Sequence, residues 1–117
     1  MKILFVENHS VFAAQVIPLF LSGHDVTLVP SLAEARRTLS ARAFDLLLVD
    51  YDLDDGKGEE LVTEIRETGS GVPVIGVSSH AAGNQALLKA GANSVCSKME
   101  FDKIQTVIQK LIGDRSV

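Results

Sequence analysis

The sequence is poor in cysteine and has no long apolar run. Its single cysteine, Cys96, cannot form an internal disulfide, so we expect a reducing, cytoplasmic environment. No stretch reaches the 18 or so apolar residues that a membrane-spanning helix requires. The apolar start at residues 3–6 is broken by Glu7, Asn8 and His9, which predicts a buried first strand rather than a signal peptide.

The sequence also lacks an excess of basic residues. Its 11 Lys and Arg are outnumbered by 15 Asp and Glu, for a net charge of −4, which argues against nucleic-acid binding. A length of 117 residues, 46% of them hydrophobic and 22% charged, is typical of one folded globular domain. With no repeat and no low-complexity linker, we expect residues 1–117 to form a single domain without an effector domain.

Short apolar segments without polar alternation recur along the chain, a pattern typical of strands that are covered on both faces of a parallel sheet. These segments are 3–6, 26–29, 46–49, 74–77 and 94–96. Strands alternating with helices predict an α/β, doubly wound fold with a five-stranded parallel sheet.

Helix-length segments with one apolar face lie between these strands. Residues 10–22 form the first, with a kink expected at Pro18. Ser31 and Glu34 form a capping box at the start of the second. The last helix has Phe101, Ile104, Ile108 and Leu111 on one face.

Polar side chains follow the predicted strands at the sheet edge where α/β proteins bind ligands. They are Glu7, Asn8 and His9; Asp50, Asp52, Asp54 and Asp55; Ser78, Ser79 and His80; and Ser97 and Lys98. Placing Glu7, Asp50 and Asp52 together without a cation would be costly, so oxygen ligands for Mg²⁺ are predicted here. The segment 54–56 also fits an ordinary turn.

At these residues the sequence resembles the receiver domain of two-component response regulators, in its stand-alone, chemotaxis-type form with a flavodoxin-like fold. The resemblance covers essentially the whole chain and implies the strand order 2-1-3-4-5. It depends on five segments, 6–8, 48–58, 73–79, 90–92 and 97–98.

The resemblance implies a role for each of these site residues. Asp50 would be the phosphoacceptor, and Ser78, Ser79 and Lys98 would bind the phosphoryl group. Glu7, Asn8, Asp50 and Asp52 would hold Mg²⁺, Asp52 through its backbone carbonyl. The implied partners are a sensor histidine kinase or phosphotransfer protein and a downstream protein target, with no nucleic acid and no membrane. The protein would be a phosphorelay switch, not an enzyme.

Four positions depart from the family pattern. Asn8 replaces a second acid and brings no charge to the metal, and Asp54 stands where a proline is usual. Met99 replaces the proline after Lys98, and a cis bond before a non-proline residue is costly, so the sequence leaves open whether this bond is cis or trans. Val95 replaces a switching aromatic residue. The side chain of Asp52 could compensate for Asn8, or it could be a solvated loop acid.

The departures leave open a pseudo-receiver, which uses the fold as a phosphorylation-independent interaction module. A flavodoxin-like redox carrier is disfavoured because Glu7 would repel a flavin phosphate. His9 and His80 are expected to be surface residues, since a zinc site needs more ligands than the sequence supplies. Cys96 is expected to be a small buried hydrophobe.

Overall fold

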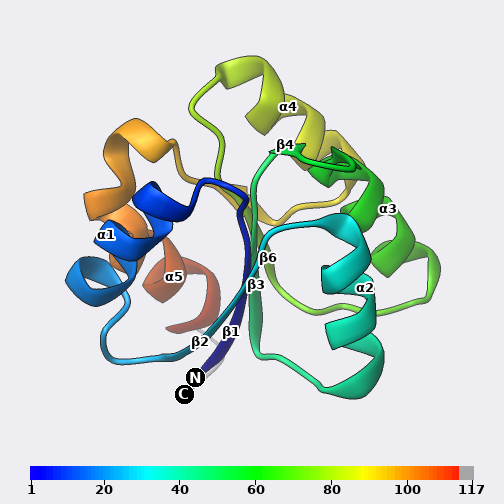
Figure 1. The fold of residues 1–117 in the computed structure, drawn as a ribbon, viewed down its shortest axis with the longest axis horizontal. Coiled ribbons are helices and arrows are strands. Elements are labelled where there is room, and N and C mark those ends of the chain that lie inside the picture. Colours follow the sequence, from blue (N-terminus) through cyan, green and yellow to red (C-terminus); the bar gives the residue numbers. More distant parts are fainter. Residues whose placement is uncertain (114–117) are drawn as a thin grey trace.

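The computed structural model describes residues 1–113 and contains a five-stranded parallel sheet (Figure 1). Its strands run in the order β2-β1-β3-β6-β7. Their bounds are β1 Lys2–Val6, β2 Asp25–Val29, β3 Leu46–Val49, β6 Val74–Gly76 and β7 Ser94–Val95. Counted within this sheet alone, the strand order is 2-1-3-4-5, which confirms the predicted flavodoxin-like topology.

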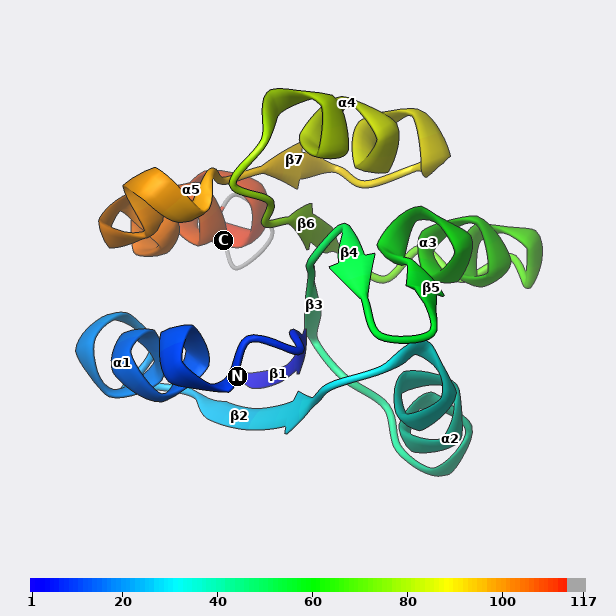
Figure 2. The same cartoon turned by 45° about the horizontal axis from the view of Figure 1, so that its top comes forward.

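Helices cover both faces of the sheet, as Figure 2 shows: α1 and α5 lie on one face, and α2, α3 and α4 on the other. Their bounds are α1 Ser10–Phe20, α2 Leu32–Ala41, α3 Gly58–Glu67, α4 Ala81–Ala90 and α5 Ile104–Ile112. None of these described helices is long and apolar enough to span a bilayer.

Two hydrophobic cores lie on the two faces of the sheet because alternate strand residues point in opposite directions. Leu4 and Leu47 face α2, α3 and α4, in a core that also contains Leu61. Phe5 and Leu48 belong to the second core with α1 and α5. The strands are therefore buried on both faces, which is why they lack polar alternation.

The helix ends match the sequence signals closely. Ser31 is the N-cap of α2, and its Oγ accepts a hydrogen bond from the Glu34 N–H (3.2 Å). Helix α1 ends at Phe20, two residues beyond Pro18. The last helix differs from expectation: residues Lys98–Lys103 form a 3₁₀ segment (η1) that is kinked at Glu100, and α5 begins only at Ile104.

A small hairpin lies between β3 and α3, where the sequence analysis predicted no strand but only a turn. In it, β4 (Asp52–Leu53) pairs antiparallel with β5 (Gly56–Lys57). Asp55 at its tip accepts hydrogen bonds from the Leu32 N–H (2.8 Å) and the Ala33 N–H (3.0 Å). The acidic turn at 54–56 is therefore a second cap for α2 as well as a turn.

Candidate functional site

The candidate site lies where β1, β3 and β6 end, at the upper edge of the sheet in Figure 1. In the parallel register, Val6 pairs with Val49, and Val49 pairs with Gly76. Glu7 and Asp50 therefore leave neighbouring strands at the same level, and Ser78 follows one strand further along. This is the switch point at which the fold class binds ligands.

One lysine joins the two buried acids of the site. The Lys98 ammonium donates a hydrogen bond to Asp50 Oδ2 (3.0 Å) and another to Glu7 Oε2 (3.0 Å). It also lies 2.8 Å from Glu7 Oε1 and 5.1 Å from the centroid of the Phe12 ring. Glu7 is 1% exposed and Asp50 is 5% exposed, so the lysine is the counterion that allows two carboxylates to be buried together.

Main-chain N–H groups also bond to one oxygen of each of these acids. The Tyr51 N–H donates to Asp50 Oδ1 (2.8 Å), and the His9 N–H donates to Glu7 Oε2 (3.0 Å). The pKa of Glu7 is raised to about 7, mainly by burial; the Lys98 hydrogen bond opposes this rise and the Asp50 charge adds to it. Because this pKa is close to neutral pH, a small change in the charge around Glu7 would alter the protonation of its carboxyl group.

Ser78 is buried, and its backbone and its side chain are both bonded to the start of α4. Its Oγ accepts a hydrogen bond from the His80 N–H (3.1 Å). The Asn84 side chain bonds both to the Ser78 N–H and to the Ser78 carbonyl. Ser79, by contrast, is exposed at the rim. The sequence analysis did not identify Asn84 as a site residue. The available signal was its position as a polar residue on the apolar face of the predicted helix.

The side chains of Asn8 and Asp52 bond to other partners than the central acids. The Asn8 amide donates to Asp54 Oδ1 (2.9 Å). The Asp52 carboxylate is paired with Lys57 and is 60% exposed. Within residues 1–113, no three His, Cys, Asp or Glu side chains converge as a ready-made metal site. The Asp52 side chain thus matches the solvated-acid alternative in this structure.

The central residues nevertheless fit a hard divalent cation. Glu7 Oε1 is buried yet accepts no well-aligned hydrogen bond, although it lies beside the Lys98 ammonium. This oxygen has a free lone pair and lies near a second carboxylate, that of Asp50. Oxygen donors of this kind suit Mg²⁺.

The positions that depart from the family pattern lie around the site. Every described peptide bond is trans, including Lys98-Met99, which the sequence left open, and Met99 is 81% exposed. His9 and His80 are exposed, as expected. Cys96 is buried, which raises the pKa of its thiol to about 11, so it is an unreactive small side chain.

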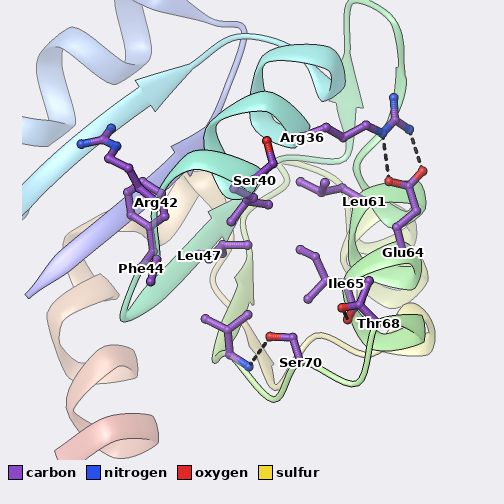
Figure 3. A pocket seen from close by; sticks show the side chains of 13 residues that line it. Arg36, Ser40, Arg42, Phe44, Leu47, Leu61, Glu64, Ile65, Thr68 and Ser70 are labelled. Atoms are coloured by element: carbon purple, nitrogen blue, oxygen red, sulfur yellow. Dashed lines mark hydrogen bonds and ion pairs between the residues drawn. The ribbon is translucent and has the colours of Figure 1, made fainter.

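A pocket of about 400 Å³ lies elsewhere, between α2 and α3 (Figure 3). Arg36 and Glu64 form a bidentate ion pair at its edge, with N···O distances of 2.9 and 2.7 Å. Its Ser40 and Thr68 hydroxyls donate to carbonyls of their own helices. No predicted site residue lines the pocket, so it is separate from the acidic centre.

Comparison with known proteins agrees with this geometry. The sequence profile of the response regulator receiver domain matches residues 3–109. The swarming motility regulation protein RssB of Serratia marcescens is 32% identical over 101 residues, which cover 84% of this chain and 46% of that protein. The chain spans about half or less of the length of the curated relatives that it matches.

Solved structures show the same fold. The receiver domain of a sensor histidine kinase from Pseudomonas aeruginosa PAO1, with magnesium coordinated in its active-site cleft, is 31% identical. Its TM-score is 0.83, with 96% of this chain and 97% of that chain covered. A response regulator from Chloroflexus aurantiacus has a TM-score of 0.85 at 21% identity, over 96% of this chain and 97% of that chain.

The family profile covers nearly the whole described chain, and the strand-end acids, serine and lysine occupy the expected places in the fold. The chain therefore belongs to the response regulator receiver domain family of two-component systems.

Proposed function

We propose that Asp50 accepts a phosphoryl group from the phosphohistidine of a histidine kinase or phosphotransfer protein, and that the protein then signals through contacts with a downstream protein. The observation that carries this proposal is the buried Asp50 carboxylate at the end of β3, 3.0 Å from the Lys98 ammonium. In the transfer, an Asp50 oxygen attacks phosphorus, the bond from phosphorus to the histidine nitrogen breaks, and the imidazole keeps the electron pair.

Each central residue has a chemical task in this transfer. The Tyr51 N–H fixes Asp50 Oδ1 and leaves Oδ2 facing Lys98. Lys98 can follow the incoming phosphoryl oxygens and offset their charge, which is most of what phosphoryl transfer requires. Ser78 Oγ already accepts the His80 N–H, so its own hydroxyl proton is available to donate to a phosphoryl oxygen.

A divalent cation would be held by Glu7, Asp50 and the backbone carbonyl of Asp52, with Asn8 as a neutral fourth donor. When bound, Mg²⁺ supplies positive charge to the transferring phosphoryl oxygens. Asn8 must then exchange its hydrogen bond to Asp54 for the cation. We expect weaker metal binding than with an acid at this position.

A second candidate function is a pseudo-receiver that binds partners without being phosphorylated. The observation in its favour is the arrangement of the side chains of Asn8 and Asp52, which bond to Asp54 and Lys57 instead of facing Asp50. In either case we propose a signalling module of the cytoplasm that binds neither nucleic acid nor membrane, supported by the net charge of −4 and the single buried thiol.

The deciding experiment is incubation with a small-molecule phosphodonor and MgCl₂, followed by intact mass spectrometry. We expect the mass of one phosphoryl group on the wild type and no gain when EDTA replaces MgCl₂. Hydroxylamine, which cleaves acyl phosphates, should remove the added mass. Asp50→Asn should gain no mass, whereas Asp25→Asn, which alters an exposed acid at the start of β2, should behave as wild type. An unmodified wild type would leave the pseudo-receiver as the function.

A further inference from the structure

The carboxamide of Asn84, on α4, is one of the few buried polar side chains and is 8% exposed. Its Oδ1 accepts a hydrogen bond from the Ser78 N–H (3.0 Å), and its Nδ2 donates to the Ser78 carbonyl (3.2 Å). The reverse amide orientation would bring two donors together and two acceptors together, so these partners determine the orientation. One side chain thereby fixes both backbone groups of Ser78.

The Ser78 carbonyl is shared with a second loop. It also accepts a hydrogen bond from the Lys98 N–H (3.2 Å). The carbonyl is therefore the point at which α4, the Ser78 loop and the start of η1 meet. The two residues expected to hold the phosphoryl group, Ser78 and Lys98, are joined through this single oxygen.

The start of α4 lies unusually close to the Ser78 side chain as well. A Cβ on Gly83 would lie only 2.6 Å from Ser78 Oγ and 3.0 Å from Tyr51 Cβ, so glycine permits the approach. The Asn84 N–H donates to the His80 carbonyl (3.2 Å) in the first turn of the helix. Asn84 is thus fixed to the helix by its backbone and to Ser78 by its side chain.

We propose that Asn84 is a positioning residue, which sets Ser78 and, through the Ser78 carbonyl, the Lys98 main chain at the phosphoryl-binding end of the site. The inference rests on the proposed function, which it deepens. Only a carboxamide offers a donor and an acceptor at this spacing, and a carboxylate could not donate to the Ser78 carbonyl. A displacement of α4 by a bound partner would consequently move both residues, without any need for a switching side chain at Val95.

The test compares Asn84→Asp and Asn84→Ala with the wild type. Asp keeps the size and one hydrogen bond but adds charge, whereas Ala removes both hydrogen bonds without adding charge. Asn93→Asp is the matched control, because Asn93 Oδ1 likewise accepts a backbone N–H, that of Val74 (2.8 Å), at the opposite end of β6. Thermal unfolding measures any general loss of stability in all three variants.

Two readouts separate positioning from stability. The first is the rate constant for Asp50 phosphorylation at saturating phosphodonor and Mg²⁺, which should fall about tenfold in both Asn84 variants and stay at the wild-type value in Asn93→Asp. The second is amide hydrogen exchange, which should become faster at Ser78 and Lys98 in the Asn84 variants while the amides of β6 stay unchanged.

The outcomes distinguish this inference from the proposed function. A phosphorylated wild type together with Asn84 variants of unchanged rate and unchanged exchange would overturn the inference and leave the function standing. A wild type that takes up no phosphoryl group would refute the function, and the exchange data alone would then decide: locally faster exchange supports positioning by Asn84, and unchanged exchange overturns it. If Asn84→Asp does not fold, Asn84→Ala decides.

Discussion

Lys98 Nζ and Asp50 Oδ2 lie 3.0 Å apart, although 48 residues separate them in the sequence. The same ammonium contacts Glu7, so one cation neutralises part of the charge of two buried acids. This contact joins the loops after the first, third and last strands of the sheet. Lys98 is therefore a structural counterion, and in the proposed transfer it is also the cation beside the phosphoacceptor.

Replacing Lys98 with methionine should destabilise the metal-free protein by about 3 kcal/mol, because it leaves two buried carboxylates without a counterion. Urea denaturation in EDTA measures this loss. Mg²⁺ should restore part of the stability, since a cation can take over the charge of the lysine. Lys89→Met, at an exposed position of α4, should change the free energy of unfolding little. Equal losses in the two variants would contradict this role of Lys98.

Glu7 should make the stability of the metal-free protein depend on pH. Its pKa is raised from 4.5 to about 7, so between these values the folded protein holds a proton that the unfolded chain releases. This contribution to the free energy of unfolding is fully present below about pH 4.5 and is lost as pH rises through 7. At about 1.4 kcal/mol per unit of pKa, the total loss is about 3 kcal/mol.

Denaturation in EDTA between pH 4.5 and pH 8 tests this dependence on the Glu7 pKa. The difference in unfolding free energy between the wild type and Glu7→Gln isolates the contribution of Glu7, because other titrating groups are common to both proteins. We expect the variant to lose less stability as pH rises. Parallel curves would show that Glu7 titrates normally.

Asn8→Asp should strengthen Mg²⁺ binding about tenfold by adding a charged oxygen ligand, since ligand charge is a main determinant of affinity for hard cations. The same change replaces the hydrogen bond from Asn8 to Asp54 with repulsion between two carboxylates. The variant should therefore be less stable than the wild type in EDTA and more stable in excess Mg²⁺. Calorimetric titration and thermal unfolding with and without metal check both parts.

If Asn8→Asp instead binds Mg²⁺ no better than the wild type, the amide position is not a ligand position. A loss of stability that persists at saturating Mg²⁺ would point to the same conclusion. Asp52→Asn is the complementary variant: because the Asp52 side chain is paired with Lys57 and is 60% exposed, it should alter Mg²⁺ affinity less than a change at position 8.

Gly83→Ala should destabilise the protein, although alanine usually favours a helix interior by about 0.5–1 kcal/mol over glycine. The new Cβ would lie 2.6 Å from Ser78 Oγ, so the start of α4 must move away from the site. We expect a loss of about 1–3 kcal/mol together with slower phosphorylation. Gly71→Ala, where no atom lies within 4 Å of the new Cβ, is the control and should be nearly neutral.

Most of the fold was predictable because its signals are local. Residues such as Leu46–Val49 are buried on both faces and therefore form a continuous apolar run, and the Ser31 cap of α2 depends on neighbours three residues away. The 3₁₀ segment Lys98–Lys103 was not predictable from periodicity, because its Phe101 continues the apolar spacing of α5 into a turn of different geometry.

The site was predictable in its centre and not at its edges. Glu7, Asp50, Ser78 and Lys98 come together because parallel strands end at one level, a property of the topology. The orientations of Asn8 and Asp52 depend on partners at Asp54 and Lys57 in a hairpin that the sequence did not signal. Asn84 lies in a helix with no motif around it, so only the fold reveals that it reaches Ser78.

The attachment of Asp55 to α2 limits the movement of the loop that follows Asp50, the proposed phosphoacceptor. Both oxygens of the Asp55 carboxylate are engaged, one by the Leu32 N–H and the other by the Ala33 N–H. The hairpin formed by β4 and β5 therefore cannot swing toward or away from Asp50 by itself. A movement of the hairpin would either displace α2 with it or first break both hydrogen bonds. A rearrangement at the proposed site would in the first case reach the face of the sheet opposite α1 and α5.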